Sequence, residues 1–117
     1  MTYLNVHTAD GIELGSHVRL TQNPWHRFLG LMGTRNLGMG QGMLFPHTNA
    51  VHGFFMRYAI RLVYLTRDQR ILRTALLKPW RLGPWVRDAY YVLELPISIE
   101  GEALKPGTRI SWSRATP

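Results

Sequence analysis

Residues 51–66, VHGFFMRYAIRLVYLT, form the densest strand-forming stretch of the chain. Read two residues at a time, one face of the stretch is apolar, and the other alternates apolar residues with Arg57 and Arg61. The stretch is longer than an ordinary strand of about 5–6 residues. It is therefore predicted to form two strands that meet at a bend near residues 57–59, or one strand with a bulge there.

The composition limits the class of protein. A chain of 117 residues can bury one sizeable core, so a single domain is predicted over residues 1–117. The absence of cysteine excludes disulfides, thiolate zinc sites and cysteine nucleophiles. Basic residues outnumber acidic ones by 14 to 7, which favours acidic partners such as nucleic acid, an anionic polymer or a phosphate or carboxylate ligand. No signal peptide or membrane-spanning pattern occurs, so a cytoplasmic location is predicted.

Residues 23–32 carry the clearest helical pattern. Asn23 can cap the first turn, Pro24 suits the first helical position, and Gly33 ends the apolar spacing. A second short helix could form over residues 97–104. The other predicted strands cover residues 3–7, 12–14, 17–20, 43–45, 71–77, 89–95 and 109–113. The predicted fold is α+β, mainly β: a compact, curled antiparallel or barrel-like sheet packed on one main helix.

A histidine and a glutamate are the first candidates for chemistry. His52, Met56 and Arg57 lie on the central stretch, and Glu94 lies on a later predicted strand. His52 and Glu94 on the same sheet could transfer protons, because burial and neighbours can tune both groups toward neutral pH. The favoured alternative is structural: His52 bonds a loop carbonyl, and Glu94 pairs with Arg57 and sets the strand register.

Residues 78–87, KPWRLGPWVR, form an aromatic and basic segment whose prolines and glycine disfavour regular structure. Trp80 and Trp85, interleaved with Arg81 and Arg87, could stack on sugars or bases while the cations hold phosphates or carboxylates. The same side chains could instead cap the open end of the sheet, with the arginine stems over the indole rings. Exposure of the tryptophans distinguishes the two interpretations.

No cofactor or metal is predicted. His47 and His52 are a potential pair of zinc ligands, with His26 or Asp88 as the only candidates for a third, and histidines unrelated to metal are the favoured interpretation. The sequence also has no Gly-x-Ser-x-Gly elbow and no phosphate-binding loop, and its seven acidic residues are too scattered to suggest a catalytic carboxylate pair.

Five short motifs occur in an order that is typical of one family. They are Arg27 with Gly30-Leu31-Met32, Gly42-Met43-Leu44-Phe45, Val51-His52 through Phe55-Met56-Arg57, Pro79-Trp80-Arg81, and Val92-Leu93-Glu94-Leu95-Pro96. With these motifs the chain resembles domain-of-unknown-function family 192, a family of small prokaryotic proteins, over roughly residues 18–113. The resemblance implies a small, strand-rich fold with one helix under the sheet. It implies no reaction, cofactor or catalytic residue.

The chain departs from the family pattern at several positions. Similar proteins usually have proline at the position of Ala59, aspartate at that of Arg61, and often aspartate at that of Thr66. If the acidic residue of similar proteins helps to bind a metal or a cationic ligand, this chain, with Arg61 at that position, has lost or inverted that function.

The residues together favour a non-enzymatic binding or accessory module. Its ligand is expected to be an anionic small molecule or a glycan, held in a groove beside the central strand. The groove is predicted to be lined by His52, Met56, Arg57, Trp80, Arg81 and Glu94. One alternative is a hydrolase that uses His52 and Glu94. The other is a nucleic-acid-binding protein that uses its excess of arginine.

Overall fold

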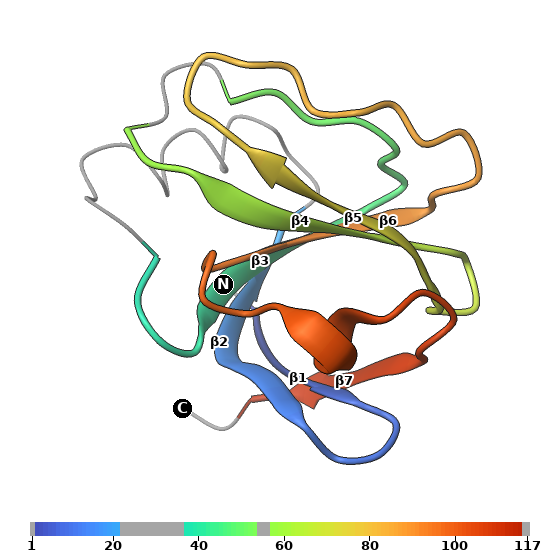
Figure 1. The fold of residues 1–117 in the computed structure, drawn as a ribbon. Helices are drawn as coiled ribbons and strands as arrows, with labels where there is room; N and C mark the ends of the chain where they lie inside the picture. The colour runs from blue at the N-terminus through green and yellow to red at the C-terminus, as the bar shows by residue number, and fades with distance from the viewer. Residues whose placement is uncertain (1, 22–36, 54–56, 116–117) are drawn as a thin grey trace.

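One seven-stranded β-sheet dominates the computed structural model, which describes residues 2–21, 37–53 and 57–115 (Figure 1). In the sheet the strands follow the order β5-β4-β6-β3-β2-β1-β7. The elements are β1 (Tyr3–Thr8), β2 (Glu13–Leu20), β3 (Gln41–Pro46), β4 (Ile60–Leu65), β5 (Ile71–Leu77), β6 (Tyr91–Leu95), the 3-10 helix η1 (Gly101–Leu104) and β7 (Ile110–Arg114). Their β-branched and aliphatic residues favour strands.

The predicted α+β class is wrong, because no helix in the described ranges reaches seven residues and the fold is nearly all β. The predicted main helix at residues 23–32 lies outside the described residues. Of the second predicted helix, at residues 97–104, only the single 3-10 turn η1 forms. Eight residues can make too few helical hydrogen bonds to offset the cost of helix nucleation without extensive packing, and here Leu104 alone is buried from that turn.

The sheet is mixed, which corrects the prediction of an antiparallel sheet. β2 and β3 run parallel, with His17 opposite Gln41 and Leu20 opposite Leu44. The remaining described strand pairs are antiparallel. A parallel pair needs a crossover of a dozen or more residues, and the segment between β2 and β3 is long enough to supply one.

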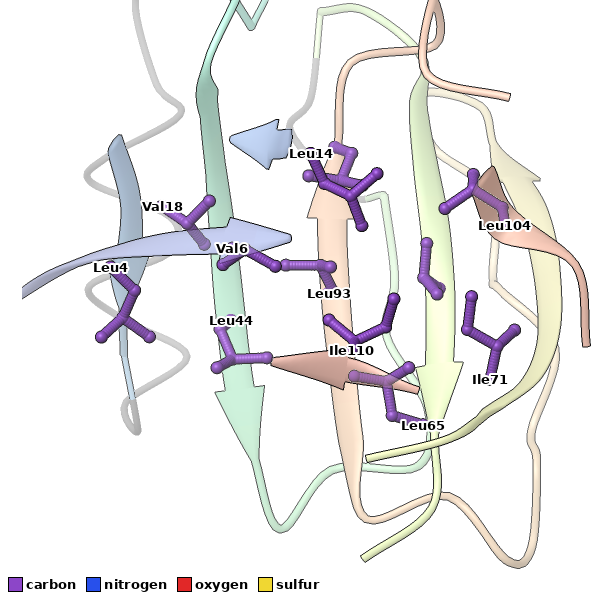
Figure 2. Packing of buried hydrophobic residues seen from close by; sticks show 12 residues of the cluster. Leu4, Val6, Leu14, Val18, Leu44, Leu65, Ile71, Leu93, Leu104 and Ile110 are labelled. Carbon is purple, nitrogen blue, oxygen red and sulfur yellow. The ribbon is translucent and has the colours of Figure 1, made fainter. Parts of the chain in front are cut away.

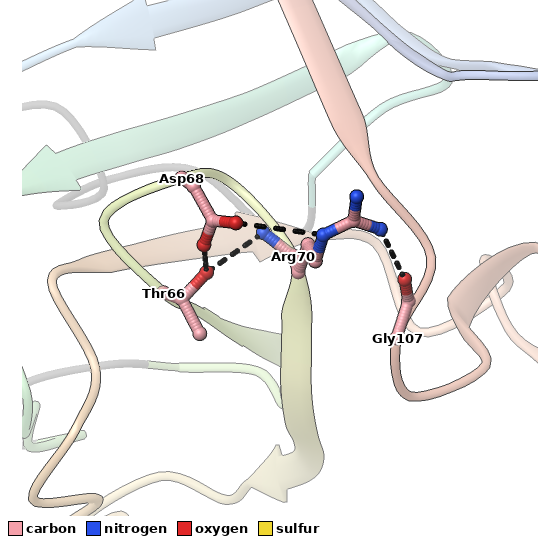
Figure 3. A network of polar contacts seen from close by, with 4 residues as sticks. All are labelled: Thr66, Asp68, Arg70 and Gly107. Atoms are coloured by element: carbon pink, nitrogen blue, oxygen red, sulfur yellow. Dashed lines mark hydrogen bonds and ion pairs between the residues drawn. The ribbon is translucent and has the colours of Figure 1, made fainter.

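The sheet curls until its two edges meet at one end. The N–H of Ile71, in edge strand β5, donates to the carbonyl of Thr108 at 2.9 Å, and the N–H of Ile110, in edge strand β7, donates to that of Gln69 at 2.8 Å. Arg70, in the β4–β5 turn, also donates to the carbonyl of Gly107 at 3.3 Å (Figure 3). Backbone hydrogen bonds therefore join the two edges of the sheet at this end.

A buried apolar cluster fills the inside of the curl. Figure 2 shows Val6 of β1 and Ile110 of β7 close to Leu93 of β6, and all three side chains are 0% exposed. The cluster consists of Leu4, Val6, Leu14, Val18, Leu44, Val63, Leu65, Ile71, Leu93, Leu95, Leu104 and Ile110. Each such aliphatic side chain contributes about 1.5–3 kcal/mol on burial, so this cluster is the main source of stability.

A second apolar cluster covers the outer face of β3, β6, β4 and β5. Its buried members are Met43, Phe45, Ile60, Leu62, Tyr64, Leu77 and Val92. Strands β4 and β6 are consequently buried on both faces, and their alternate residues divide between the two clusters. Residues of the segments before β4 and after β5, among them Val51 and Val86, pack against this outer cluster.

The described part of the central stretch, residues 51–53 and 57–66, contains one strand, which begins only at residue 60. β4 occupies only Ile60–Leu65, and residues 57–58 form the predicted bend. Before the bend the described residues contain an isolated bridge at His52 and no strand. Gly53 explains part of this change, because its backbone packs so closely that an added Cβ would lie 2.5 Å from the carbonyl oxygen of Lys78.

Candidate functional site

Residues 78–86 are fastened to residues 49–53 by backbone hydrogen bonds, and the two segments run side by side beyond β4 and β5 (Figure 1). The N–H of Trp80 donates to the carbonyl of Gly53 at 2.7 Å. The N–H of Gly53 donates in return to the carbonyl of Arg81, also at 2.7 Å. This reciprocal pair fixes the start of the loop against the end of the other segment.

Two further backbone bonds extend the same contact. The N–H of Gly83 donates to the carbonyl of Val51 at 2.9 Å, and the N–H of Val86 donates to that of Asn49 at 3.0 Å. Four hydrogen bonds along one short ribbon hold the loop in a single conformation before any ligand arrives. Such preorganisation lowers the entropy lost on binding.

Large apolar side chains stand out from this ribbon. Trp80 is 59% exposed, Leu82 74% and Trp85 66%, and His52, which bridges Leu82, is also exposed. These residues and the exposed Arg81 are called the Trp80 surface. Three of the eight large exposed hydrophobic residues in the described ranges lie here. Large apolar side chains exposed together on one short loop make this loop a candidate interaction site.

The charges around the Trp80 surface are mainly positive. Lys78, Arg81 and Arg87 are exposed on the same loop, and Asp88 is the exposed acidic residue next to them. An anion approaching this loop therefore meets an excess of cations, each with a hydrophobic stem that can lie along an aromatic ring.

Trp80 has an unusual backbone conformation for a large residue. Its φ is 62°, in the left-handed region that glycine adopts at little cost. Among non-glycine residues in the described ranges only His47 and Gln69 share this conformation. A left-handed residue with a Cβ costs about 1–2 kcal/mol, and residues held in this way are concentrated at functional sites.

The loop rests directly on the outer apolar cluster. A Cβ added to Gly83 would lie 3.0 Å from Cδ1 of Leu62 and 3.2 Å from the hydroxyl of Tyr64, so only a glycine allows this approach without movement. The Tyr64 hydroxyl donates to the carbonyl of Pro84 at 2.6 Å. Strand β4 thus positions the loop by packing and by one partly buried hydrogen bond.

The environment of Tyr64 alters its acidity. Burial raises the pKa of the Tyr64 phenol above its usual value, the positive charge of Arg73 lowers it in part, and the negative charge of Glu94 adds to the increase. Arg73 is the residue opposite Tyr64 on β5. The phenol is therefore kept protonated and remains a hydrogen-bond donor to Pro84.

The structure brings together some of the predicted groove residues. His52, Trp80 and Arg81 lie on the bonded ribbon, and all three are exposed. Arg57, beyond residues 54–56, is also exposed, while Met56 lies outside the described residues. The exposed tryptophans favour the functional interpretation of the loop over the one in which they cap the sheet.

Glu94 lies apart from this surface. Its side chain is 0% exposed, on the outer face of β6, and its neighbours across the strands are Met43 of β3 and Leu62 of β4. Because it is fully buried, Glu94 does not line an open groove, whereas His52 is exposed. Glu94 lies on the same face of β6 as Val92, and the sequence alone does not indicate whether that face is covered.

Arg61 of β4 has a structural partner. One of its terminal nitrogens donates to the carbonyl of Ile97 at 3.3 Å and lies 3.4 Å from a carboxylate oxygen of Glu100. The Arg61 side chain is 19% exposed and that of Glu100 72%. Arg61 therefore fastens the segment that leads to η1.

A second group of polar side chains was not predicted from the sequence. The hydroxyl of Tyr90 and Nε2 of His47 are 2.9 Å apart, and the guanidinium carbon of Arg67 lies 5.3 Å from the centre of the Tyr90 ring. The three residues are far apart in the chain, so no spacing pattern could have indicated their contact. The left-handed φ of 53° at His47 is equally invisible in the sequence.

No group of three or more His, Asp or Glu side chains in the described ranges is arranged to hold a metal ion. His26, one of the residues considered as a third zinc ligand, lies outside those ranges. None of the helices that the structure describes is long and apolar enough to cross a lipid bilayer.

Two solved structures have this fold. A protein of unknown function from Novosphingobium aromaticivorans matches with a TM-score of 0.71 at 20% identity, over 94% of this chain and 84% of its own. A protein from Sinorhizobium meliloti, described as a candidate transcription regulator, matches with a TM-score of 0.70 at 22% identity, over 96% of each chain. At these identities the likeness concerns the fold alone.

The sequence comparisons agree with one another. A UPF0127 protein of Pyrococcus furiosus is 36% identical over 115 residues, covering 95% of this chain and 97% of the relative. A UPF0127 protein of Pyrococcus abyssi is 26% identical over 113 residues, covering 92% and 95%. The family pattern described as "Uncharacterized ACR" matches residues 5–112, nearly the whole chain. The chain therefore belongs to domain-of-unknown-function family 192, as its motifs indicated.

Proposed function

We propose that the protein is a non-enzymatic binding module that holds an anionic carbohydrate on the Trp80 surface. The observation that carries the proposal is the state of Trp80, which is 59% exposed and yet held in a left-handed conformation. A large aromatic residue that is more than half exposed, on a backbone conformation that costs about 1–2 kcal/mol for a residue with a Cβ, is typical of a contact surface rather than of a packed core.

The chemistry of the surface favours a sugar that carries acidic groups. Indole rings offer flat apolar faces to the C–H groups of a pyranose ring, and the rigid side chain loses little conformational entropy on contact. Arg81 and the neighbouring cations can pair with carboxylate or sulfate groups on the same sugar. The groove predicted from the sequence is thus replaced by an exposed ribbon from which Glu94 is excluded.

The two alternatives have less support. A hydrolase using His52 and Glu94 needs both groups in contact with substrate, and Glu94 is fully buried. Nucleic-acid binding would use the same arginines and tryptophans, since stacking and cation contacts also hold single strands. It is kept as an outcome of the test.

The test is a titration of the protein with four probes at equal ionic strength, followed by tryptophan fluorescence and by isothermal titration calorimetry. The probes are a heparin-derived hexasaccharide, an oligogalacturonate, neutral maltohexaose and a single-stranded DNA oligonucleotide. The proposal predicts saturable binding of at least one acidic oligosaccharide and at least about tenfold weaker binding of maltohexaose, a difference of about 1.4 kcal/mol. Tighter binding of the oligonucleotide than of either acidic sugar would favour the nucleic-acid alternative.

Variants locate the site. Trp80→Gly removes the indole, and glycine suits the left-handed backbone. This variant should bind the acidic oligosaccharide about tenfold more weakly, or weaker still. Arg81→Gln should weaken binding of the acidic oligosaccharide and make that binding less dependent on salt, because one fewer cation contacts the ligand. The matched controls are Ile97→Ala and Arg114→Gln, which remove an exposed apolar and an exposed basic side chain elsewhere. Equal losses in controls and test variants would refute the assignment of the site.

A further inference from the structure

A cluster of donor side chains lies where β3 and β4 end and β6 begins. His47 follows β3, Arg67 follows β4, and Tyr90 precedes β6. Nε2 of His47 and the Tyr90 hydroxyl are 2.9 Å apart, and their ring centres are 4.5 Å apart. The guanidinium of Arg67 lies over the same tyrosine ring at 5.3 Å. Tyr90 therefore has polar neighbours from two separate segments.

The backbone holds the members of this cluster in place. The N–H of Tyr90 donates to the carbonyl of Leu65 at 2.8 Å, and the N–H of Thr48 donates to the carbonyl of Tyr90 at 3.0 Å. The Thr48 hydroxyl donates to the carbonyl of Pro46 at 2.9 Å. His47, between these anchored residues, has a φ of 53°. Its imidazole is thus directed by a strained backbone, a feature concentrated at functional sites.

The electrostatic surroundings of the cluster favour an anion. The nearest carboxylate in sequence to Arg67 is that of Asp68, which instead contacts the Thr66 hydroxyl and lies 3.4 Å from Nε of Arg70 (Figure 3). Within the described part of the chain Arg67 forms no ion pair. The exposed Arg67 guanidinium therefore keeps its charge available for a ligand.

We propose that His47, Arg67 and Tyr90 form a binding site for a small oxyanion, such as a phosphate or sulfate group. When Nε2–H of His47 donates to the Tyr90 oxygen, the phenolic O–H is free to donate outward to the anion. The guanidinium of Arg67 lies over the same ring, so its N–H groups are available close to the Tyr90 hydroxyl. One oxyanion can then accept a neutral and a charge-assisted hydrogen bond together.

This site is separate from the Trp80 surface, both in its residues and in the observations from which it is inferred. It uses none of the residues of that surface, and it does not depend on a carbohydrate ligand. Asp88 and Arg87, two and three residues before Tyr90, are the exposed charged residues closest to it in sequence on that side. They bear opposite charges, so the charge of Arg67 decides the sign of the site.

The test is an NMR titration of the full chain with inorganic phosphate, at pH 6.5 and with ionic strength kept constant by sodium chloride. The imidazole signal of His47 and the ring signals of Tyr90 should shift with one saturable curve, with a dissociation constant on the order of 1 mM. Inorganic sulfate and glucose 6-phosphate are run in parallel. Tighter binding of the sugar phosphate would assign the site to phosphate monoesters, and equal binding would assign it to the free ions.

Three variants test the role of each group. Tyr90→Phe keeps the stacked ring and removes the hydroxyl, Arg67→Gln removes the charge, and His47→Gly suits the left-handed backbone. Each should weaken phosphate binding about tenfold or more, whereas Arg114→Gln, on the exposed end of β7, should leave it unchanged. Backbone amide spectra check that each variant is folded.

Two results would overturn this inference. One is an unsaturable shift that involves His7 and His17 as much as His47, which would mean an adventitious ion only. The other is saturable binding that survives both Tyr90→Phe and Arg67→Gln. Trp80→Gly serves as the cross-control: it should leave phosphate binding unchanged, so failure of this site and failure of the carbohydrate site give different patterns.

Discussion

The carbonyl of Gly53 accepts a hydrogen bond from the N–H of Trp80 at 2.7 Å. This bond joins the segment that precedes β4 to the segment that follows β5. Gly53 is buried and Trp80 is 59% exposed. The bond therefore links an anchored backbone to an exposed aromatic ring. The position of the Trp80 surface depends on this contact, and several consequences can be measured.

Gly53→Ala should disrupt the ribbon. The new Cβ would lie 2.5 Å from the carbonyl of Lys78, so one backbone segment must move, at a cost of about 1–3 kcal/mol in the free energy of unfolding. Urea denaturation and amide exchange of Trp80 and Gly83 measure the effect. Gly38→Ala is the matched control, since its Cβ would meet only the flexible side chain of Gln41, at 3.2 Å. A Gly53→Ala variant as stable and as protected as the control would contradict this account of the ribbon.

Trp80→Gly should change the stability by no more than about 1 kcal/mol. The relief of a left-handed conformation, about 1–2 kcal/mol, is offset by the greater flexibility of glycine in the unfolded chain, about 0.5–1 kcal/mol. Trp85→Gly also makes the unfolded chain more flexible, but it relieves no left-handed conformation, because Trp85 does not have a positive φ. The midpoint temperature of thermal unfolding should therefore be higher for Trp80→Gly than for Trp85→Gly. The reverse order would show that the Trp80 indole contributes packing that its exposure conceals.

Tyr64→Phe should change how stability depends on alkaline pH. The pKa of Tyr64 is raised by burial above its ordinary value of 10.0, so the unfolded chain loses this proton first. The stabilisation is complete below about pH 10 and is lost as the pH rises through the folded pKa. Denaturation between pH 8 and 11 should show a shallower decline for Tyr64→Phe than for the parent chain, and Tyr3→Phe, at an exposed residue, should leave the slope unchanged.

Thr66→Val should raise the pKa of the Asp68 carboxyl. The Thr66 hydroxyl is the main cause of the lowered pKa of Asp68, with smaller contributions that include the charge of Arg70. A carboxyl with a lowered folded pKa contributes stability above its unfolded value, near 3.8, which is lost as the pH falls through the folded pKa. Carbon-detected NMR titration of the Asp68 carboxyl checks this. An unchanged titration in Thr66→Val would show that the hydroxyl is not its partner in solution.

Arg61→Asp should loosen the segment that Arg61 fastens. The variant loses the hydrogen bond to Ile97 and places a poorly exposed carboxylate near Glu100, for an expected loss of about 2 kcal/mol. Glu100→Gln alone should cost less than about 0.5 kcal/mol, since Glu100 is 72% exposed. Combining Arg61→Asp with Glu100→Lys should recover part of the loss. Denaturant unfolding of the parent chain, Arg61→Asp, Glu100→Lys and the variant that combines them forms a double-mutant cycle, and strictly additive effects would exclude a coupling between the two positions.

The strands were predictable because their patterns are local. The predicted strands at residues 71–77 and 89–95 correspond to β5 and β6. Within the central stretch β4 begins only at Ile60, because residues 51–53 pair with the loop at residues 80–83 and residues 57–58 form a bend. Helix content was overestimated near η1 for the same reason that short helices are marginal: a single turn gains little without burial.

The candidate site was predicted in part. His52, Trp80 and Arg81 were named from residue type, and the structure brings them onto one ribbon. Glu94 was named for its chemistry, which does not reveal whether a strand face is covered by a loop, and it is fully buried. The contact of His47 with Tyr90 joins residues 43 positions apart, and no local pattern carries that information.

The sequence by itself determined the family, the strand-rich character of the chain and the concentration of tryptophan and arginine in one loop, because motifs, alternation and composition are properties of neighbouring residues. Only the tertiary structure decided the parallel pairing of β2 with β3, the exposure of Trp80 and the burial of Glu94. Each of these depends on which distant segments meet. Pairing and coverage are settled by the packing of the whole sheet, to which every strand contributes at once.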